Sequence, residues 1–170
     1  MCAAEGAGLE LLVVITPMFK VDPRVRGYFG IGIENSKFEV NIGTLWRSAL
    51  TFDADFIFTI GKRYTHQSTD TTQSWRHLPL FNYENVEDFR KHLPSGCSVI
   101  GVERDARAKS LETFRHPQRA VYVLGPEDGS LSEELVSSCD FLVQFYGKYS
   151  VNVGVAGSIL MYDRNRKRQA

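Results

Sequence analysis

The sequence predicts an α/β fold in which helices cover both faces of a mostly parallel sheet. Short apolar runs, typical of buried strands, alternate along the chain with segments of helical periodicity. This alternation indicates βαβ units, whose connections place helices on the faces of a parallel sheet. Ligands of such sheets bind at the loops that follow the carboxyl ends of the strands. A functional site is therefore expected in those loops.

The first elements follow one another closely. Residues 28–33 (YFGIGI) form an expected strand, residues 41–50 a helix with one apolar side, and residues 55–60 a second strand. The next stretch, residues 62–77, is polar and rich in Thr and Ser, which indicates a long loop. No element is assigned to residues 1–27.

The second half of the chain repeats the pattern. Asn85 is expected to cap a short helix that reaches Leu93. Ser130 and Glu133 have the spacing of a capping box for another helix. Strands are expected at residues 98–102, 120–124 and 141–143, with an irregular charged stretch at residues 103–117.

The last helix is expected to have two unlike faces. Residues 154–158 (GVAGS) contain very small side chains, which indicates that another segment packs very close to this helix. Ser150 is expected to cap the helix and Asn152 to lie in its first turn, although free N–H groups at a helix start also suit a bound small molecule. The larger apolar residues at helical spacing are Val151, Val155, Ile159 and Tyr162.

Composition favours one domain. The chain has 170 residues, 43% of them hydrophobic, and a formal net charge of +0, so no overall field attracts nucleic acid. Three distant cysteines without a C-x-x-C motif indicate a reducing compartment and no structural metal. No apolar run reaches membrane-spanning length, so a cytoplasmic protein is expected. The expected parts are an extension (residues 1–27), a domain (residues 28–163) and a solvated basic tail (residues 164–170).

Three junctions between a strand and a helix carry polar residues. Asn41 and Arg47 lie on the first expected helix, where Arg47 could simply extend to water or pair with a carboxylate. The sequence GPEDG, residues 125–129, follows a strand directly and could be a tight turn. The third junction is Ser150–Asn152. Each of the three has an ordinary structural explanation when taken alone.

Together, and in this order, the three junctions resemble a known family. N-x-G-x-x-x-R-S-A, then G-x-E-x-G after a strand, then S-x-N-V before a helix of small residues resemble the SpoU/TrmH family of RNA ribose 2′-O-methyltransferases, within the SPOUT superfamily. The resemblance extends from about Tyr28 to Asp163. Family members commonly read G-x-E-x-x-G-L, whereas Gly129 comes one place early here, and Gly154 stands where Ser is frequent.

The resemblance implies a deep C-terminal trefoil knot, which the general rule against threaded loops would reject. It also implies a homodimer whose active site lies near the interface, and S-adenosylmethionine held mainly by backbone groups. The implied cofactor-binding residues are Val102, Glu103, Leu124, Gly125, Glu127, Gly129, Phe141, Leu142, Val143, Ser150, Asn152 and Val153.

The resemblance also implies the catalytic roles. Arg47 would align the ribose hydroxyl with the methyl group and help remove its proton. Because a guanidinium is a poor base, a clamp on an RNA phosphate or on the developing alkoxide is preferred. Asn41 would orient Arg47 or the ribose. Glu127 would hold its loop or an arginine, and Asn152 would order the knot loop and the cofactor.

The expected substrate is tRNA, with the ribose of wobble nucleotide 34 as the first choice, because stand-alone family members of this size act there. No membrane or DNA partner is expected. Tyr64 or Tyr146 could stack on an unpaired base. The expected phosphate contacts are Arg24, Arg26, Arg47, Lys62, Arg63, Lys148 and the tail from Arg164 to Arg168.

Other functions stay open. The same fold could methylate rRNA, or it could bind RNA without turnover. Gly30 and Gly32 also suggest a dinucleotide-binding loop, but the third glycine position holds Asn35 and the pair lies inside a strand rather than after it.

Overall fold

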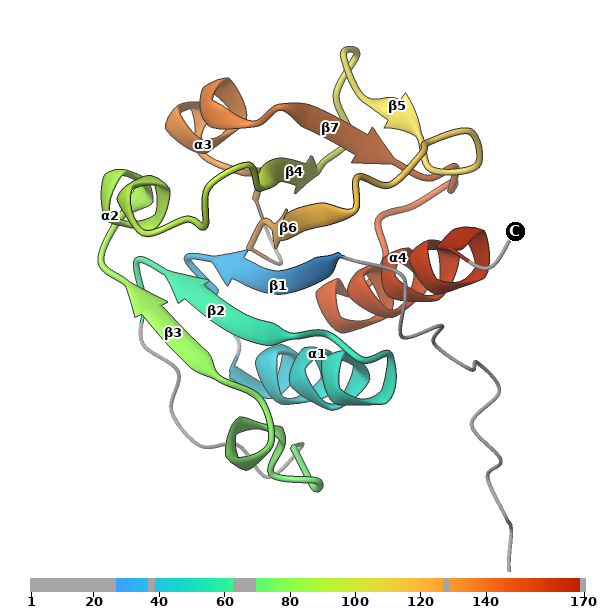
Figure 1. The fold of residues 1–170 in the computed structure, drawn as a ribbon. Coiled ribbons are helices and arrows are strands. Elements are labelled where there is room, and N and C mark those ends of the chain that lie inside the picture. Colours follow the sequence, from blue (N-terminus) through green and yellow to red (C-terminus); the bar gives the residue numbers. More distant parts are fainter. Residues whose placement is uncertain (1–26, 37–38, 63–69, 127–128, 169–170) are drawn as a thin grey trace, which may run out of the picture.

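A computed structural model describes residues 27–36, 39–62, 70–126 and 129–168. In this part of the chain, seven strands form one parallel sheet in the order β3-β2-β1-β6-β4-β7-β5 (Figure 1). The strands are β1 (Tyr28–Glu34), β2 (Phe56–Ile60), β3 (Leu80–Tyr83), β4 (Ser98–Val102), β5 (Lys109–Ser110), β6 (Arg119–Leu124) and β7 (Phe141–Gln144). The helices are α1 (Glu39–Thr51), α2 (Val86–Lys91), α3 (Glu133–Ser138), α4 (Val153–Arg168) and the single 3₁₀ turn η1 (Ser74–Arg76).

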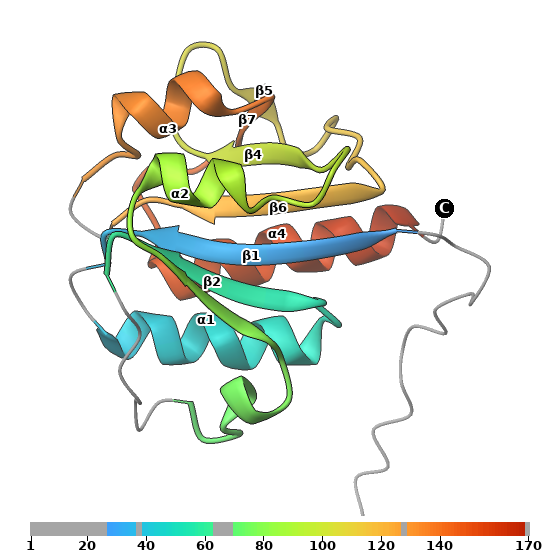
Figure 2. The ribbon, with the colours of Figure 1, turned by 60° about the vertical axis from the view of Figure 1, so that its left-hand side comes forward.

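Helices cover both faces of the sheet, as the sequence predicts (Figures 1 and 2). Side chains of α1 and α4 join one buried apolar cluster, and those of α2 and α3 join another on the opposite face. The central strands β1 and β6 are buried almost throughout, which explains their continuous apolar runs. The predicted fold class is confirmed.

The glycine pair of β1 serves packing. A Cβ atom on Gly30 would lie 2.2 Å from the ring of Phe56, and one on Gly32 would lie 2.3 Å from the ring of Phe58. The aromatic rings of β2 therefore fold over β1 only because these two positions carry no side chain. This packing explains both glycines without a nucleotide, so the dinucleotide-binding alternative has no support.

The small residues of α4 let it approach α1 closely. A Cβ atom on Gly157 would lie 2.2 Å from the side chain of Leu45, and one on Gly154 would lie 2.9 Å from Thr44. Ser158 donates a hydrogen bond of 2.8 Å to Ser48. The predicted close packing partner of the last helix is therefore α1.

Two strands and one cap differ from the sequence prediction. The short edge strand β5 lies in the stretch 103–117, expected to be irregular because of its charged composition. The edge strand β3 follows Pro79, in a short segment to which no element is assigned from the sequence. The cap of α3 is Ser132 rather than Ser130, and its side chain accepts a hydrogen bond of 3.2 Å from the N–H of Leu135. The predicted cap of α2, Asn85, is confirmed by its bond of 2.8 Å from the N–H of Asp88.

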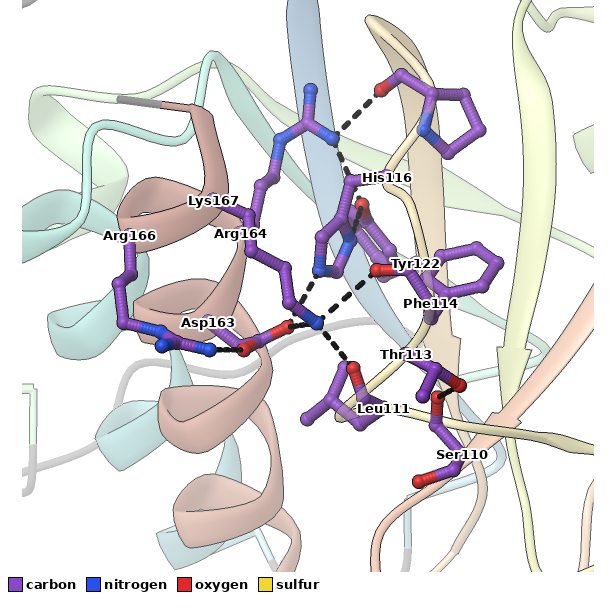
Figure 3. A network of polar contacts seen from close by, with 11 residues as sticks. Ser110, Leu111, Thr113, Phe114, His116, Tyr122, Asp163, Arg164, Arg166 and Lys167 are labelled. Atoms are coloured by element: carbon purple, nitrogen blue, oxygen red, sulfur yellow. Dashed lines mark hydrogen bonds and ion pairs between the residues drawn. The ribbon is translucent and has the colours of Figure 1, made fainter. Parts of the chain in front are cut away.

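The expected solvated tail is wrong for residues 164–168, which continue helix α4. Arg164 is only 4% exposed and donates to the carbonyl oxygens of Pro117 and Gln118 at 2.8 and 2.9 Å and to the hydroxyl of Tyr122 at 2.9 Å. Lys167 donates to the carbonyl oxygens of Leu111 and Phe114 (Figure 3). These contacts attach the end of α4 to the segment between β5 and β6.

Asp163 lies at the centre of this network. Its carboxylate contacts Lys167 at 2.7 Å, His116 at 3.0 Å and Arg166 at 3.2 Å (Figure 3). Burial opposes the ionisation of Asp163, but hydrogen bonds from these three side chains outweigh burial and lower its pKa. The network lies at the amino ends of the strands, because the N–H of Tyr28, at the start of β1, donates to the carbonyl oxygen of Gln118.

The path of the C-terminal segment is unusual for a doubly wound sheet. Strand β7 lies between β4 and β5, both of which precede it in the chain. Helix α4 then returns to α1, on the other half of the sheet (Figure 1). The trefoil knot implied by the family resemblance stays a prediction.

Candidate functional site

A cavity of about 260 Å³ lies at the carboxyl ends of β4, β6 and β7. Its floor is apolar, since Val102 and Leu124 end β4 and β6 there and Val143 is the second-last residue of β7. The wall beside α4 is also apolar. The residues that line the cavity are Val102, Glu103, Arg104, Leu124, Gly125, Pro126, Gly129, Val143, Gln144, Phe145, Tyr146, Gly147, Tyr149, Ser150, Val151, Val153, Ala156 and Ile159.

Two loops contribute backbone groups to the border of the cavity. Glycines and a proline of the loop after β6 form one side, and the loop after β7 forms the other. Strand carbonyls and loop N–H groups at the end of a parallel sheet have no ladder partner on their outer side. Such groups suit the edge of a flat heterocycle, which needs donors and acceptors in one plane.

The loop after β7 is the most exposed part of the site. Tyr146 is 96% exposed and Tyr149 is 74% exposed. The ammonium group of Lys148 lies 5.3 Å from the centre of the Tyr149 ring. Exposed aromatic rings beside a cation are costly on a surface without a partner and are typical of a surface that stacks on an aromatic ligand.

The first and third motifs meet at the start of α4. The side-chain amide of Asn152 donates a hydrogen bond of 2.6 Å to Asn41, which lies 111 residues earlier in the chain. The carbonyl oxygen of the same side chain accepts from the N–H groups of Gly154 at 2.9 Å and Val155 at 3.4 Å. Asn152, and not Ser150, therefore caps α4 and ties it to α1.

Arg47 lies outside the cavity. It is on the exposed face of α1 and is not among the residues that line the cavity. Asn41 and Arg47 are six positions apart, which corresponds to roughly 9 Å along a helix. The structure thus places Arg47 on the same helix as the Asn41–Asn152 contact but away from the cavity of its own chain.

Most of the predicted cofactor-binding residues line the cavity. Phe141 and Leu142 do not, because β7 runs toward the cavity and only its last residues reach it, while Leu142 faces the cluster under α2 and α3. Asn152 also lies outside, although both its neighbours line the wall. The predicted residues that line the cavity are Val102, Glu103, Leu124, Gly125, Gly129, Val143, Ser150 and Val153.

The sequence reading missed several lining residues. Arg104, Pro126, Ala156 and Ile159 were not selected, and neither was the aromatic side chain of Phe145. The proximity of Arg104 to the predicted Glu103 was the available signal. For α4, residues one turn after Val153 could have been found from helical spacing.

Some predicted residues lie outside the described part of the chain. They include one predicted catalytic residue, Glu127, and the predicted phosphate contacts Arg24, Arg26 and Arg63, as well as Tyr64. Lys62 is described and exposed. In the described residues no helix has the length and apolar character needed to span a membrane.

Comparison with known proteins gives a consistent picture. Mouse (Mus musculus) tRNA (guanosine(18)-2'-O)-methyltransferase TARBP1 is 26% identical over 141 residues, which are 75% of this chain but 9% of that protein. Other curated relatives, from Archaeoglobus fulgidus and Bacillus subtilis, are matched over 66% and 54% of their lengths. The chain therefore spans only part of the curated relatives that it matches.

Solved structures share the fold. The SpoU methyltransferase AviRb from Streptomyces viridochromogenes, in complex with the cofactor AdoMet, superimposes with a TM-score of 0.72 at 23% identity, covering 85% of this chain and 60% of AviRb. A structure concerned with the 2-OH methylation of C/U34 on tRNA gives 0.72 at 19% identity, covering 85% of this chain and 93% of that chain. The profile of the SpoU rRNA Methylase family matches residues 29–162, and the chain therefore belongs to this family.

Proposed function

We propose that this protein is an S-adenosylmethionine-dependent RNA ribose 2′-O-methyltransferase. The observation that carries the proposal is the convergence of separate motifs at one end of the sheet, where the Asn41–Asn152 contact adjoins the cavity bordered by Gly125 and Gly129. Family membership supports the activity, and the AdoMet bound to AviRb supports the cofactor.

The residues of the cavity fit this cofactor. Val102, Leu124 and Val143 offer an apolar surface for an adenine ring, and the backbone of the two loops offers hydrogen-bonding groups for its edge. When bound, S-adenosylmethionine supplies a methyl group on a positively charged sulfur. The chain's own task is to hold the ribose hydroxyl in line with that group and to help remove its proton.

Arg47 serves the RNA side of the reaction. Its guanidinium is a weak base but an effective partner for a phosphate or a developing alkoxide. Because Arg47 is exposed and does not line the cavity of its own chain, we infer that it acts on the site of a second copy. The site is then complete only in a homodimer.

The surface of α4 supports such a dimer. Val155, Ile159 and Tyr162 form an apolar stripe along its outer side, 46%, 38% and 45% exposed, and Val40 of α1 is 56% exposed. Ile159 also lines the cavity, so the stripe is continuous with the site. A second copy seated on the stripe would bury this apolar surface and approach the cavity.

A charge introduced into the apolar stripe tests the dimer. Val155→Asp should leave the fold intact, because the side chain is already half exposed, but should produce a monomer with little methyl transfer. Phe81→Asp is the matched control, since Phe81 is 45% exposed on the edge strand β3 and should leave the dimer intact. Light scattering at micromolar protein concentration measures whether each variant is a monomer or a dimer. A monomeric and fully active wild type would contradict the dimer.

The proposed substrate is tRNA, with the ribose of nucleotide 34 as the first target. Lys148 and Arg104 are exposed beside the cavity and Arg47 is exposed on α1, so all three can contact phosphates. Tyr146 and Tyr149 can stack on an unpaired base. The similar fold of the structure concerned with C/U34 and the relationship to a tRNA methyltransferase support this choice.

Two measurements test the function. Calorimetry should detect S-adenosylmethionine binding, and mass spectrometry of nuclease-digested RNA should find a methyl group on a tRNA ribose after incubation with the enzyme and labelled cofactor. A methyl group found only in rRNA, or on a base, would overturn the substrate. A folded protein that binds no S-adenosylmethionine would overturn the enzyme proposal.

Arg47→Ala separates chemistry from binding. Methyl transfer should fall by about 100-fold or more, as expected when one electrostatic partner of a transition state is removed. Cofactor affinity should stay within about twofold, because Arg47 is outside the cavity. Arg90→Ala, on helix α2 and thus on the opposite face of the sheet, is the control and should retain full activity. A large loss of cofactor affinity in Arg47→Ala would contradict the assignment of Arg47 to the RNA side of the site.

A further inference from the structure

A buried carboxylate at the end of β1 holds the segment that follows β6. Glu34 is only 2% exposed, and its two oxygens accept hydrogen bonds from the backbone N–H of Ser132 at 2.8 Å and from its hydroxyl at 2.5 Å. The two residues are 98 positions apart. A carboxylate that accepts two hydrogen bonds in a buried place fixes its partner much more firmly than a surface contact does.

A second carboxylate approaches the same segment from the other side. Glu103, directly after β4, accepts a hydrogen bond of 2.9 Å from the N–H of Leu131, and its other oxygen accepts one of 2.9 Å from the N–H of Arg104. Strands β1 and β4 flank β6 in the sheet. Consecutive residues of one segment are therefore held by carboxylates from both neighbours of the strand that precedes it.

The held segment lies directly against the wall of the cavity. A Cβ atom on Gly125 would lie 3.1 Å from the backbone nitrogen of Leu131 and 3.3 Å from the carbonyl carbon of Ser130. Gly125 lines the cavity, as does Glu103. A shift of Leu131 and Ser132 would thus displace the backbone that faces the ligand.

We propose that Glu34 is a positioning residue for the cofactor of methyl transfer, acting through Ser132 and sharing this task with Glu103. Glu34 itself does not line the cavity, so its effect must travel through the segment it holds. The proposal rests on the proposed function, because the ligand positioned by this segment is S-adenosylmethionine.

The chemistry of the contact accounts for the acid. The hydroxyl of Ser132 accepts a bond from the N–H of Leu135, so its proton is free to be donated to Glu34. The N–H and the hydroxyl of Ser132 therefore both donate toward Glu34. A carboxylate suits them because it has two acceptor oxygens and no donor of its own. Glu34→Gln keeps one carbonyl oxygen as an acceptor, whereas Glu34→Ala leaves the two partly buried donors of Ser132 without this partner.

The chain contains a matched control for this contact. Asp70 is also 2% exposed, and its carboxylate accepts from the backbone N–H of Ser74 at 2.9 Å and from its hydroxyl at 2.8 Å. It lies at η1, which packs against α1 and does not border the cavity. Asp70→Ala therefore removes the same kind of contact from the fold and leaves the cofactor segment alone.

The experiment measures S-adenosylmethionine affinity by calorimetry at a temperature well below unfolding. Glu34→Ala should weaken binding by about tenfold or more, and Glu34→Gln should recover most of the loss. Asp70→Ala should lower the melting temperature like Glu34→Ala but bind the cofactor like the wild type. The Glu34→Ala and Ser132→Ala changes should be non-additive in affinity, because both remove the bond from the Ser132 hydroxyl to Glu34.

The result that overturns the proposal is a Glu34→Ala protein that loses stability but binds like Asp70→Ala, since a purely structural carboxylate would behave in that way. If Glu34→Ala does not fold, Ser132→Ala is tested instead and should weaken S-adenosylmethionine binding. Ser132→Thr, which retains the hydroxyl, should bind the cofactor like the wild type. If Ser132→Ala also bound the cofactor as tightly as the wild type, the proposal would be refuted. A wild type that binds no S-adenosylmethionine would overturn the proposed function as well. A wild type that binds, with variants unaffected, would refute only the role of Glu34.

Discussion

The two ends of the sheet are built in opposite ways. At the carboxyl ends of the strands lies an open cavity bordered by loop backbone, with Tyr146 and Tyr149 largely in solvent. At the amino ends, Asp163, His116 and Arg164 form a closed polar network in which side chains hold one another and nearby carbonyl groups. Helix α4 belongs to both ends, because its first turn lines the cavity and its last turns carry residues of the network (Figure 3).

This difference indicates that ligand binding depends on one end of the sheet and the stability of the fold on the other. Groups at the open end keep unused hydrogen-bonding capacity, which a ligand can take. At the closed end the two terminal guanidinium nitrogens of Arg164 are buried with their partners, while its Nε is buried without one among the described residues. Losing a partner there leaves further groups buried and unsatisfied. Variants at the closed end should therefore change the free energy of unfolding, and variants at the open end should change binding.

The largest effect is expected at Arg164. Arg164→Ala should lower the free energy of unfolding by about 4 kcal/mol, because it leaves two carbonyl oxygens and the Tyr122 hydroxyl without their donor. Urea denaturation measures the loss. Arg166→Ala, two positions further along α4, is the control; its side chain is 58% exposed and its ion pair with Asp163 should contribute at most about 1 kcal/mol. Equal losses in the two variants would contradict the contrast between the ends.

The network should also make stability depend on pH. Burial lowers the pKa of His116 from 6.5 to about 4, although Asp163 favours the charged form, and Arg164 and Lys167 oppose it. His116 is thus neutral at pH 7: its Nε2–H donates to Asp163, and its Nδ1 accepts from the Tyr122 hydroxyl.

The sign of the pH effect follows from that lowered pKa. Between about pH 6.5 and 4 the unfolded chain binds a proton that the folded protein does not, so stability should fall as the pH falls through this range. The loss due to His116 should reach roughly 3 kcal/mol by about pH 4. At lower pH stability should fall further, because the pKa of Asp163 is lowered in the folded protein. Denaturation curves across this range test it, and His116→Gln should flatten them while His77→Gln, at an exposed site, should not. A wild-type stability that is constant from pH 6.5 to 4.5 would refute the neutral buried imidazole.

The smallest effect is expected at Asn152. Asn152→Ala should weaken S-adenosylmethionine binding by about fivefold to tenfold and should cost about 1 kcal/mol of stability, because it removes the cap of α4 and its tie to Asn41. Asn152→Asp retains the acceptor for the N–H of Gly154 and should recover stability without recovering affinity. Calorimetry measures the affinity of the two variants and thermal unfolding measures their stability, so together they separate the helix cap from the contact with Asn41. Equal recovery of affinity and stability in Asn152→Asp would show that only the cap matters.

Local patterns predicted much of this fold. Continuous apolar runs identified the buried strands β1, β2, β4, β6 and β7, since a strand covered on both faces needs apolar residues at consecutive positions. The edge strands β3 and β5 were not predicted, because an edge strand is short and partly solvated and its sequence resembles that of a loop. The small residues of α4 predicted a close neighbour without saying which one.

The basic residues show where sequence reasoning stops. Lys148 and Arg164 are both basic residues in the last part of the sequence. Lys148 is exposed beside the cavity, whereas Arg164 is buried at the amino ends of the strands. Charge is a property of one residue, whereas burial depends on which distant segment covers it. The sequence alone therefore could not tell a candidate phosphate contact from a structural arginine.

By itself, the sequence determined the α/β class, the main buried strands and the three motifs, because each depends on residues that are neighbours in the chain. Only the tertiary structure decided that Asn41 meets Asn152, that Glu34 holds Ser132, and that the end of α4 is a buried network instead of a solvated tail. These contacts join residues roughly 50 to 110 positions apart, and their existence depends on the order of the strands in the sheet, which no local pattern encodes.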